Sequence, residues 1–553
     1  MTAGTSQRRT AMLAKLAELD AEHAKAVAGG GEKYVERHHA RGKLLARERI
    51  ELLIDEGSPF LELSPLAGWG SDFTVGASVV TGIGTVEGVD CVIVANDPTV
   101  KGGASNPFTL KKVFRANQIS VENGLPIISL VESGGADLVT QKEIFIPGGR
   151  LFRDLTRASA DRRTTIALVF GNSTAGGAYV PGMSDYTVMV KGQAKVFLGG
   201  PPLVKMATGE ESDDESLGGA EMHARQSGLA DYLAEDEYDA IRLGRRIVAR
   251  LNRSQESPVD RGNLDWTGIA TPAKSRNHRP TGDSTPPPFA EPDADPEELL
   301  DLIPTDLKEP FDPREVIVRI CDGVSETNGA VFDEFKPLYG PSLVTGWAKL
   351  HGHQIGVLAN AQGVLFSEEA QKATQFIQLA NQIDCPLLFL HNTTGYMVGA
   401  EYEQGGIIKH GAMMINAVSN STVPHLSVIM GASYGAGNYG MNGRAYDPRF
   451  LFTWPNAKSA VMGPQQLAGV LSIVSRASAE AKGKPFDEEA DAQMRAFVEA
   501  AVEEASLPFA LSGMLYDDGV IDPRDTRTVL GLCLDVIAQR PIKGTSQWGV
   551  FRA

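Results

Sequence analysis

Two glycine-rich turns are the segments of this sequence whose residue types could do chemistry. In the first, the apolar run 166–170 leads into GNSTAGGAYV at 171–180. In the second, the apolar run 426–430 leads into GASYGAGNYG at 431–440. Each run predicts a buried strand, and each turn predicts the start of a helix whose first N–H groups have no partner within the helix.

Free backbone amides at a helix start can hold a developing negative charge, because the N–H groups and the helix dipole both favour an anion. Such an oxyanion hole needs no particular side chain, only residues small enough to let a ligand approach the backbone. We place the expected donors at Gly176 and Gly177 in the first turn and at Ala436 and Gly437 in the second. Tight helix–strand packing needs the same small residues, so the spacing alone leaves both interpretations open.

The second turn also contains the pattern G-x-S-x-G, which is typical of the nucleophile elbow of hydrolases. In that fold the serine is followed along the chain by an acid and then by a histidine. All ten histidines of this chain precede Ser433. The required order is missing, so we do not expect a hydrolase, and we interpret Ser433 as a turn residue.

Other cofactor and metal motifs are missing from the sequence. It has no G-x-x-x-x-G-K-[ST] phosphate loop and no G-x-G-x-x-G in a strand–helix frame, so ATP cleavage is not expected. The four cysteines are scattered without metal-ligand spacing, and we expect no metal. The basic residues between Lys33 and Arg49 either contact nucleotide phosphates or form a solvated helix face. We expect the pair His38 and His39 to lie at the surface.

Composition excludes several classes of function. The 553 residues include 52 Lys and Arg against 69 Asp and Glu, a net charge of −17, which argues against nucleic-acid binding. No apolar run approaches the ~20 residues of a membrane helix, and the first residues lack the apolar core of a secretory leader. Scattered cysteines fit a reducing compartment. We therefore expect a cytoplasmic protein with neither membrane nor nucleic acid as partner.

Short apolar strands alternate with helices along the chain, which predicts an α/β fold with a largely buried sheet. The expected helices are 7–28, 44–55, 109–123 and 150–160, and the expected strands are 78–81, 84–86, 91–95, 127–131 and 165–170.

The sequence also repeats internally. Residues 78–97 match 342–361 at an offset of 264, and both 125–130 with 385–390 and 171–179 with 431–439 match at an offset of 260. Three matches in one order predict two similar domains in tandem. Nine prolines fall within 271–310, which indicates a linker. We expect domains at 1–285 and 311–553, joined by a Pro-rich linker at 286–310.

Motifs along nearly the whole chain resemble the carboxyltransferase (β) subunits of biotin-dependent acyl-CoA carboxylases. They include RGKLLARERIELLIDEGSPFLEL (41–63), GNSTAGGAYVPGMSD (171–185), FLGGPPLVKMATGE (197–210) and GASYGAGNYGMNGRAYDPRF (431–450). The resemblance implies a tandem pair of crotonase-like domains, the β-β-α superhelix of the ClpP/crotonase superfamily. This implication agrees with the internal repeat.

Within the family, the chain is most similar to methylcrotonoyl-CoA carboxylase β subunits, through NAQGVLFSE (360–368), HNTTGYMVG (391–399) and GAGNYGM (435–441). His391, Thr393 and Tyr396 depart from the usual Q-N-I-T-G-F of that branch. The implied substrate is 3-methylcrotonyl-CoA, an intermediate of leucine degradation, or a related branched or isoprenoid enoyl-CoA. Alternatives within the fold are a propionyl- or acetyl-CoA carboxylase β subunit, and a decarboxylase or transcarboxylase carboxyltransferase.

The resemblance also implies a mechanism. Carboxybiotin, carried by another subunit, releases CO2, and the amides of Ala436 and Gly437 stabilise the biotin ureido oxygen. The ureido nitrogen then removes a proton from the acyl-CoA, whose thioester oxygen is held by Gly176 and Gly177. The base belongs to the cofactor, so no side-chain base is needed. The implied substrate-binding residues are Ser133, Gly134, Gly135, Ala178, Gly395, Tyr396, Asn438 and Tyr439.

The same resemblance implies the partners. No biotin-accepting A-M-K-M segment occurs in the chain, so a separate α subunit with biotin carboxylase and biotin carrier domains is the expected partner. The implied assembly is a homohexamer, a trimer of dimers in which the first domain of one copy faces the second domain of another. Two other functions are considered, a non-catalytic scaffold and a crotonase-type hydratase or isomerase. Two open amide turns argue against the first, and the two-domain length argues against the second.

Overall fold

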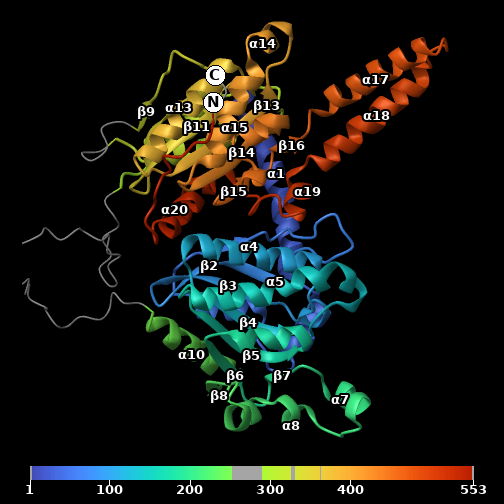
Figure 1. The fold of residues 1–553 in the computed structure, drawn as a ribbon, viewed down its shortest axis with the longest axis vertical. Coiled ribbons are helices and arrows are strands. Elements are labelled where there is room, and N and C mark those ends of the chain that lie inside the picture. Colours follow the sequence, from blue (N-terminus) through green and yellow to red (C-terminus); the bar gives the residue numbers. More distant parts are fainter. Residues whose placement is uncertain (1–2, 252–288, 325–330, 362, 551–553) are drawn as a thin grey trace, which may run out of the picture.

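The fold consists of two mixed β-sheets, one in each half of the chain, with helices on both faces of each sheet. The computed structural model describes residues 3–251, 289–324, 331–361 and 363–550. Apart from the N-terminal helix, which extends into the upper part, the first half of the chain occupies the lower part of Figure 1 and the second half the upper part. The predicted α/β class and tandem arrangement are confirmed.

The first sheet has the strand order β1-β2-β3-β4-β5-β6-β8, and β7 pairs with the end of β5. The strands β1 to β3 are antiparallel, and the pairs from β3 onward are parallel. Its described strands are β1 (Phe60–Leu63), β2 (Val79–Val86), β3 (Val89–Asn96), β4 (Ile127–Ser133), β5 (Thr165–Thr174), β6 (Tyr186–Val190), β7 (Lys195–Phe197) and β8 (Tyr232–Ala234).

The second sheet repeats this plan with the order β15-β14-β13-β11-β10-β9, in which β12 pairs with β13 and β16 with the end of β14. Its described strands are β9 (Phe332–Glu334), β10 (Leu343–Leu350), β11 (His353–Asn360), β12 (Gly363–Leu365), β13 (Leu387–Tyr396), β14 (His425–Tyr434), β15 (Phe450–Thr453) and β16 (Lys458–Ala460).

A buried lysine occupies the same place in each half and supports the duplication independently. Lys112 donates to the carbonyl oxygens of Gly76 and Val79, at 3.2 and 2.8 Å. Lys372 donates to those of Gly340 and Leu343, at 3.3 and 2.8 Å. The acceptors are 264 residues apart and the lysines 260 apart, the offsets found in the sequence.

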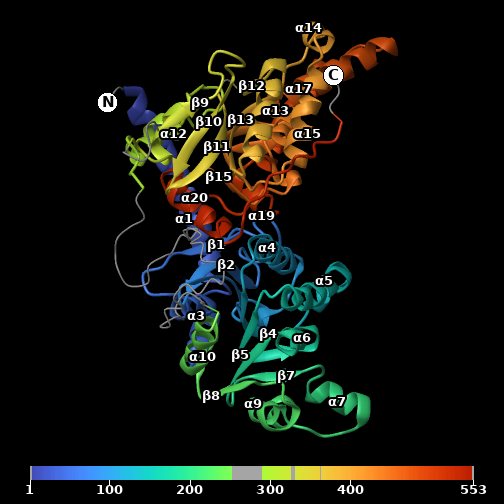
Figure 2. The ribbon, with the colours of Figure 1, turned by 60° about the vertical axis from the view of Figure 1, so that its left-hand side comes forward.

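Helices cover both faces of each sheet (Figure 2). In the first half, α4, α5 and α6 lie on one face, and α3 and α10 on the other. The helices of this half are α1 (Ala3–Ala28), α2 (Glu32–His39), α3 (Ala46–Leu53), α4 (Pro107–Asn123), α5 (Gln141–Ala160), α6 (Tyr179–Met183), α7 (Pro201–Thr208), α8 (Asp214–Gly218), α9 (Ala220–Met222) and α10 (Glu237–Ala249), with short turns η1 (Lys101–Gly103), η2 (Leu138–Thr140), η3 (Ala175–Ala178) and η4 (His223–Ser227).

In the second half, α13 and α15 lie on one face of the sheet, and α12 and α20 on the other. The helices α17 and α18 form a hairpin that projects from the body (Figure 1). The helices of this half are α11 (Leu299–Leu302), α12 (Pro313–Ile320), α13 (Ser367–Gln382), α14 (Ala400–Gln404), α15 (Ile407–Asn420), α16 (Gly435–Gly440), α17 (Pro464–Ala481), α18 (Glu488–Ala505), α19 (Pro508–Gly513) and α20 (Thr526–Ile537), with short turns η6 (Pro296–Glu298), η7 (Arg444–Tyr446) and η8 (Pro523–Asp525). Among the described residues, no helix is both long and apolar enough to cross a membrane.

Several predicted elements differ from the structure in their bounds. The expected strands 78–81 and 84–86 are one strand, β2. Helix α4 starts two residues earlier than expected, because Asn106 caps it by accepting from the amides of Phe108 and Thr109. Helix α5 starts at Gln141, nine residues earlier than expected, and contains Pro147, a poor helix former. Helix α2 was not predicted.

The N-terminal helix α1 packs against the second half of the chain. Its Arg8 forms an ion pair with Glu309, and its Arg9 forms one with Asp301. Its Met12 is fully buried in one apolar core with Leu299 of α11, which falls within the predicted linker. Residues 252–288 lie outside the described part of the chain, and the domain bounds 1–285 and 311–553 stay a prediction.

Candidate active site

The first glycine-rich turn connects β5 to the short helices η3 and α6. Strand β5 ends at Thr174, and Ala175 takes a left-handed conformation with φ of 53° that turns the chain sharply. The helix then begins, as the sequence predicts. Gly176 and Gly177 lie in its first turn, and their amides donate to no described group outside their own helix. Gly176 is exposed and Gly177 half-buried, so both amides are near the surface.

Ser133, Gly134 and Gly135 lie beside this turn, at the carboxyl end of β4. The Ser133 hydroxyl donates to the carbonyl oxygen of Gly103 at 2.7 Å, and it accepts from the amide of Gly135 at 3.1 Å. A Cβ at Gly135, where φ is 92°, would lie 3.1 Å from the carbonyl oxygen of Thr174. The structure therefore brings the predicted loop 133–135 against the residue that precedes the first turn.

The second turn has the same design. Strand β14 ends at Tyr434, Gly435 takes a φ of 53°, and α16 begins there. Ala436 and Gly437 lie in its first turn, and neither amide donates to a described group outside the helix. Ala436 is exposed, whereas Gly437 is buried.

The two turns differ in how tightly their second donor is packed. A Cβ added at Gly177 would meet only the Ser173 hydroxyl, at 3.5 Å, an ordinary contact. A Cβ added at Gly437 would lie 2.9 Å from Thr393 Oγ1 and 3.0 Å from Gly395 Cα. Strand β13 therefore fixes the position of Gly437, and glycine is required there for steric reasons.

The other residues predicted to bind substrate lie around these two turns. Ala178 is buried behind the first turn. Tyr396 lies behind α16, where its hydroxyl contacts Met414 Sδ at 3.4 Å, and burial raises its pKa well above the usual range. Asn438 is half-buried, and Tyr439 is exposed and packs on Tyr446, with ring centroids 5.8 Å apart.

Ser433 is not the turn residue that the sequence suggested. It is the penultimate residue of β14, it is 1% exposed, and its Oγ lies 3.0 Å from Nδ1 of the buried His391. The rule of chain order used in the sequence analysis could not find this Ser–His pair, because β13 precedes β14. Asn438 Nδ2 also donates to Ser433 Oγ, at 2.9 Å. A hydroxyl this buried cannot attack a substrate, so the pair is not a nucleophile and its base.

A cluster of buried charges lies against the start of the first turn, where Glu132 contacts Gly171. The sequence analysis did not identify this cluster. Arg49 is fully buried, bonds to Glu237 through two nitrogens at 2.8 Å and to Glu132 at 2.8 Å, and stacks over Phe170. Lys43 pairs with Glu132 and donates to the Phe170 carbonyl oxygen at 2.9 Å. The solvated helix face is therefore wrong for Lys43 and Arg49, because each is bonded to Glu132 inside the fold. The fully buried Arg49 cannot reach a nucleotide phosphate either.

His38 is also buried rather than at the surface, and the sequence interpretation was wrong for it. Its Nε2 lies 3.1 Å from the Leu44 carbonyl oxygen. Burial lowers its pKa, although the nearby Glu132 acts to raise it. His39 is exposed and contacts Glu48 at 3.1 Å.

Exposed apolar side chains lie next to both turns. On the first side they belong to η2 and α5, and the Phe152 ring of α5 lies 3.4 Å from where a Gly176 Cβ would be. On the second side they belong to the segments that follow β13 and β16 and to α15. They are Leu138, Val139, Phe145 and Ile146 on the first side, and Val398, Ile408 and Val461 on the second.

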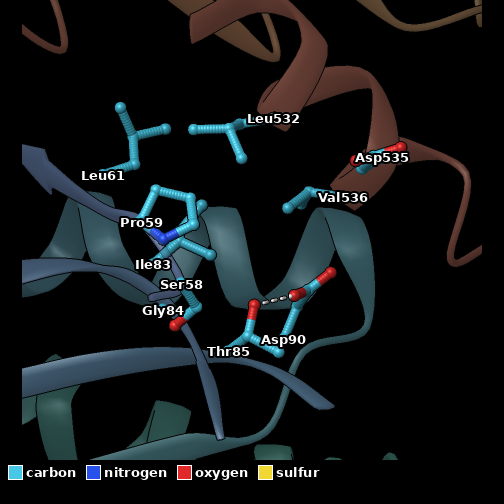
Figure 3. Close-up of a pocket in the computed structure, with 10 residues that line it drawn as sticks. All are labelled: Ser58, Pro59, Leu61, Ile83, Gly84, Thr85, Asp90, Leu532, Asp535 and Val536. Atoms are coloured by element: carbon cyan, nitrogen blue, oxygen red, sulfur yellow. Dashed lines mark hydrogen bonds between the residues drawn. The ribbon is translucent and has the colours of Figure 1, made fainter. Parts of the chain in front are cut away.

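A separate pocket of about 240 Å³ lies between the two halves (Figure 3). Apolar side chains of β1, β2 and α20 line most of it, and Asp90 accepts a hydrogen bond from Thr85 at its edge. None of the residues of the two turns lines this pocket. The candidate chemistry therefore lies at the turns, where the strands end.

The described residues hold no group of three or more His, Cys, Asp or Glu side chains that could bind a metal ion. All four cysteines are buried free thiols, at Cys91, Cys321, Cys385 and Cys533. Two turns whose amides donate to no described group outside their own helices suit the stabilisation of an oxyanion.

Comparison with known proteins identifies the class. The chain matches the carboxyl transferase domain family over residues 37–551 and belongs to that family. It is 71% identical to a probable biotin-dependent acyl-coenzyme A carboxylase beta2 subunit of Mycobacterium tuberculosis, over 98% of this chain and 96% of that protein. It is 47% identical to the biotin-dependent 3-methylcrotonyl-coenzyme A carboxylase beta1 subunit of the same organism, over 97% and 96%.

The fold agrees with that of a solved relative. The β subunit of geranyl-CoA carboxylase from P. aeruginosa superimposes with a TM-score of 0.84, at 42% identity, over 99% of this chain and 98% of that chain. The protein is therefore an enzyme, the carboxyltransferase component of a biotin-dependent acyl-CoA carboxylase, and it transfers a carboxyl group to an acyl-CoA. The resemblance noted in the sequence is confirmed, as is the crotonase-like fold.

Proposed function

We propose that the acyl-CoA carboxylated by this enzyme is 3-methylcrotonyl-CoA or a related branched enoyl-CoA. The observation that carries the proposal is the 47% identity over nearly the full length to a 3-methylcrotonyl-CoA carboxylase β subunit. The relative that acts on geranyl-CoA, at 42% identity, favours the same chemical class, an enoyl thioester branched at its β carbon.

We assign the first turn to the acyl-CoA. The amides of Gly176 and Gly177 are placed to donate to the thioester oxygen as negative charge develops on it. Two features support this assignment: both amides are accessible, and the loop 133–135 lies beside them with its own backbone fixed by the Ser133 hydroxyl. Removing one such donor costs about 10²–10³ in rate in comparable sites.

We assign the second turn to biotin. The ureido oxygen of biotin is a hydrogen-bond acceptor that gains charge in the reaction, and it fits a pair of amide donors without a cationic side chain. The tight packing of Gly437 against β13 holds its N–H in one direction. When carried to this site by the partner subunit, carboxybiotin supplies both the CO2 and the base, so the chain itself needs only to bind, orient and exclude water.

We further propose that a complete active site requires two copies of the chain. Figures 1 and 2 place β7, beside the first turn, and β13, beside the second, in opposite halves of the molecule. Exposed apolar side chains flank each turn, and burying such surfaces is a driving force for association. A trimer of dimers, bound to a biotin-carrying α subunit, is the assembly that we propose, and the scattered thiols favour a cytoplasmic location.

A reconstituted carboxylation assay tests the substrate. The protein is mixed with a biotin-carrying α subunit, ATP and labelled bicarbonate, and kcat/KM is measured for acetyl-, propionyl-, 3-methylcrotonyl- and geranyl-CoA. We expect a branched enoyl-CoA to give the highest value. Preference for propionyl- or acetyl-CoA contradicts the proposed substrate. The same sample, analysed by light scattering, reports the assembly, and a monomer that is active contradicts the two-copy site.

A further inference from the structure

The buried Ser433–His391 pair carries an inference about the second turn. Nδ1 of His391, Oγ of Ser433 and Nδ2 of Asn438 form a chain of hydrogen bonds of 3.0 and 2.9 Å that joins β13, β14 and α16. His391 is fully buried and Ser433 nearly so. Only Asn438, at the end of this chain, belongs to the helix that presents the amides.

The polarity of the chain depends on the imidazole tautomer of His391. The Asn438 amide N–H donates to Ser433 Oγ, so the serine hydroxyl hydrogen is available for His391 Nδ1. The tautomer with its hydrogen on Nε2, a buried atom with no hydrogen-bond partner among the described residues, accepts that hydrogen and completes the chain. Burial lowers the pKa of His391 to about 3, although the backbone of Met441 acts in the opposite direction, and the ring is therefore neutral at physiological pH.

Helix α16 needs an anchor of this kind. It has six residues, three of them glycine, and so short a helix with that composition has little stability of its own. Of its side chains, Tyr439 is exposed and Asn438 reaches the interior. On its other side, Asn438 Oδ1 lies so close to Gly443 that a Cβ there would be 1.9 Å away. The Asn438 side chain is thus held between Ser433 and Gly443.

The first turn is anchored differently, which shows what the histidine adds. At the position that corresponds to Ser433, the Ser173 hydroxyl donates directly to the carbonyl oxygen of Gly177, at 2.9 Å. The positions that correspond to His391 and Asn438 are Val131 and Ala178, both buried among apolar residues. In the second turn the serine hydroxyl is directed to His391 instead, and the helix is held through the asparagine.

We propose that His391 is a positioning residue for carboxyl transfer: by accepting from Ser433 it fixes Asn438, and through Asn438 it fixes the direction of the Ala436 and Gly437 amides. The proposal rests on the assignment of the second turn to biotin. His391 contacts neither substrate, so its effect passes through α16. The reaction requires His391 only as a neutral hydrogen-bond acceptor in a fixed position.

Three variants in the complex with the α subunit test this role. His391→Leu removes the acceptor and keeps the bulk, His391→Gln keeps an acceptor oxygen, and Ser433→Ala breaks the chain by removing a single oxygen atom. We expect His391→Leu and Ser433→Ala to lower kcat tenfold or more, with the KM for acyl-CoA changed less than twofold. We expect His391→Gln to stay within threefold of the unmodified enzyme.

A matched control lies at the start of β14, the strand that carries Ser433 near its end. His425 is also buried, and its Nε2 lies 2.8 Å from Ser421 Oγ. We expect His425→Gln to leave kcat unchanged. The hydrogen bonds described for Ser421 go to Asn381 and His425, and Asn442, the other partner of His425, follows the carboxyl end of α16 rather than the end that presents the amides. Hydrogen exchange of the amides of residues 435–440 gives a readout independent of activity. It should be faster in His391→Leu and Ser433→Ala, and unchanged in His391→Gln and His425→Gln.

Each result bears on one of the two proposals. Unchanged kcat and unchanged exchange in Ser433→Ala overturn the positioning role, and so does a His391→Gln variant as impaired as His391→Leu. If His391→Leu does not fold, Ser433→Ala decides. Faster exchange in α16 together with a raised KM for acyl-CoA and an unchanged kcat supports the positioning role but contradicts the assignment of the second turn to biotin.

Discussion

Arg115 of helix α4 and Asp518, which follows α19, join the two halves of the molecule by a buried two-pronged ion pair. The guanidinium nitrogens donate to the two carboxylate oxygens at 2.7 and 2.9 Å. Arg444, a few residues after α16, donates to the same carboxylate at 2.7 Å. Burial acts to raise the pKa of Asp518, but the two arginines outweigh it and hold the pKa well below the usual range.

The first prediction concerns this pair. Arg115→Met leaves a buried carboxylate with one partner fewer, and we expect a loss of about 3–5 kcal/mol in unfolding free energy. The contribution of Asp518 is present above the carboxyl pKa of the unfolded chain and is lost as pH falls through the folded value, so the loss should shrink below about pH 4.

Urea unfolding at pH 7 and at pH 3.5 measures both effects. Arg476→Met is the control, because that arginine pairs with Glu488 at an exposed site, and we expect no measurable change from it. A wild-type-like unfolding midpoint for Arg115→Met would contradict the importance of this interface.

The second prediction separates the two glycine donors. Gly177→Val places its Cβ in ordinary contact with the Ser173 hydroxyl, at 3.5 Å, so we expect a folded protein whose rate of carboxyl transfer falls by about 10²-fold or more as the side chain crowds the first turn. Gly437→Val introduces it against Gly395 and Thr393, so we expect a lower melting temperature as well as a loss of activity. Gly469→Val, at a helical position with no neighbour within 4 Å, is the control. Near-normal turnover in either turn variant would argue against the amide turns.

The third prediction concerns the left-handed residue at the start of each turn. Ala175 and Gly435 share a φ of 53°, a conformation that costs a residue with a Cβ about 1–2 kcal/mol. Gly435→Ala should therefore destabilise the protein by about that amount, and more because the new Cβ would lie 3.1 Å from the Val461 carbonyl oxygen. Ala175→Gly should be neutral or slightly stabilising, because relief of strain is offset by the greater freedom of glycine in the unfolded chain. Denaturant unfolding measures the unfolding free energy of both variants. An equal loss in Gly435→Ala and Ala175→Gly would rule out left-handed backbone strain as the explanation.

The fourth prediction is a pH dependence of stability that depends on His391. Its pKa is about 3 in the folded protein and ~6.5 in an unfolded chain. Between these values the unfolded chain binds a proton that the folded protein does not, so the unfolding free energy is lost as pH falls through this window, by up to ~1.4 kcal/mol per pH unit.

Comparison of melting temperatures for the unmodified protein and His391→Gln at pH 7.5 and pH 5 isolates this effect. Burial also lowers the pKa of His425, to about 4, but that residue is present in both proteins and cancels. The glutamine variant should gain stability relative to the unmodified protein as pH falls. A difference that is the same at both pH values would show that His391 does not titrate in this way.

The sequence was sufficient to predict the duplicated α/β fold and the position of both turns, because strand burial and glycine placement are local properties that repeat at fixed offsets. It was not sufficient for residues whose role depends on a distant partner. Arg49 reads as one more charge on a basic helix until Glu132, 83 residues away in the sequence, is placed beside it. Ser433 and His391 lie on neighbouring strands, but only the register between those strands, which is irregular at this point, brings them together.

The packing of α1 on the second half has a consequence for synthesis of the protein. This helix is made before the second half, and Arg8 finds its acceptor on Leu302 only 294 residues later. At translation rates of about 5–20 residues per second, the interval is roughly 15–60 s. During that time the apolar stripe of Met12, Leu16 and Leu19, which is buried in the finished fold, has no second half to cover it. The stripe is therefore exposed until the second half is made, and expression of the first half alone would leave it without that cover.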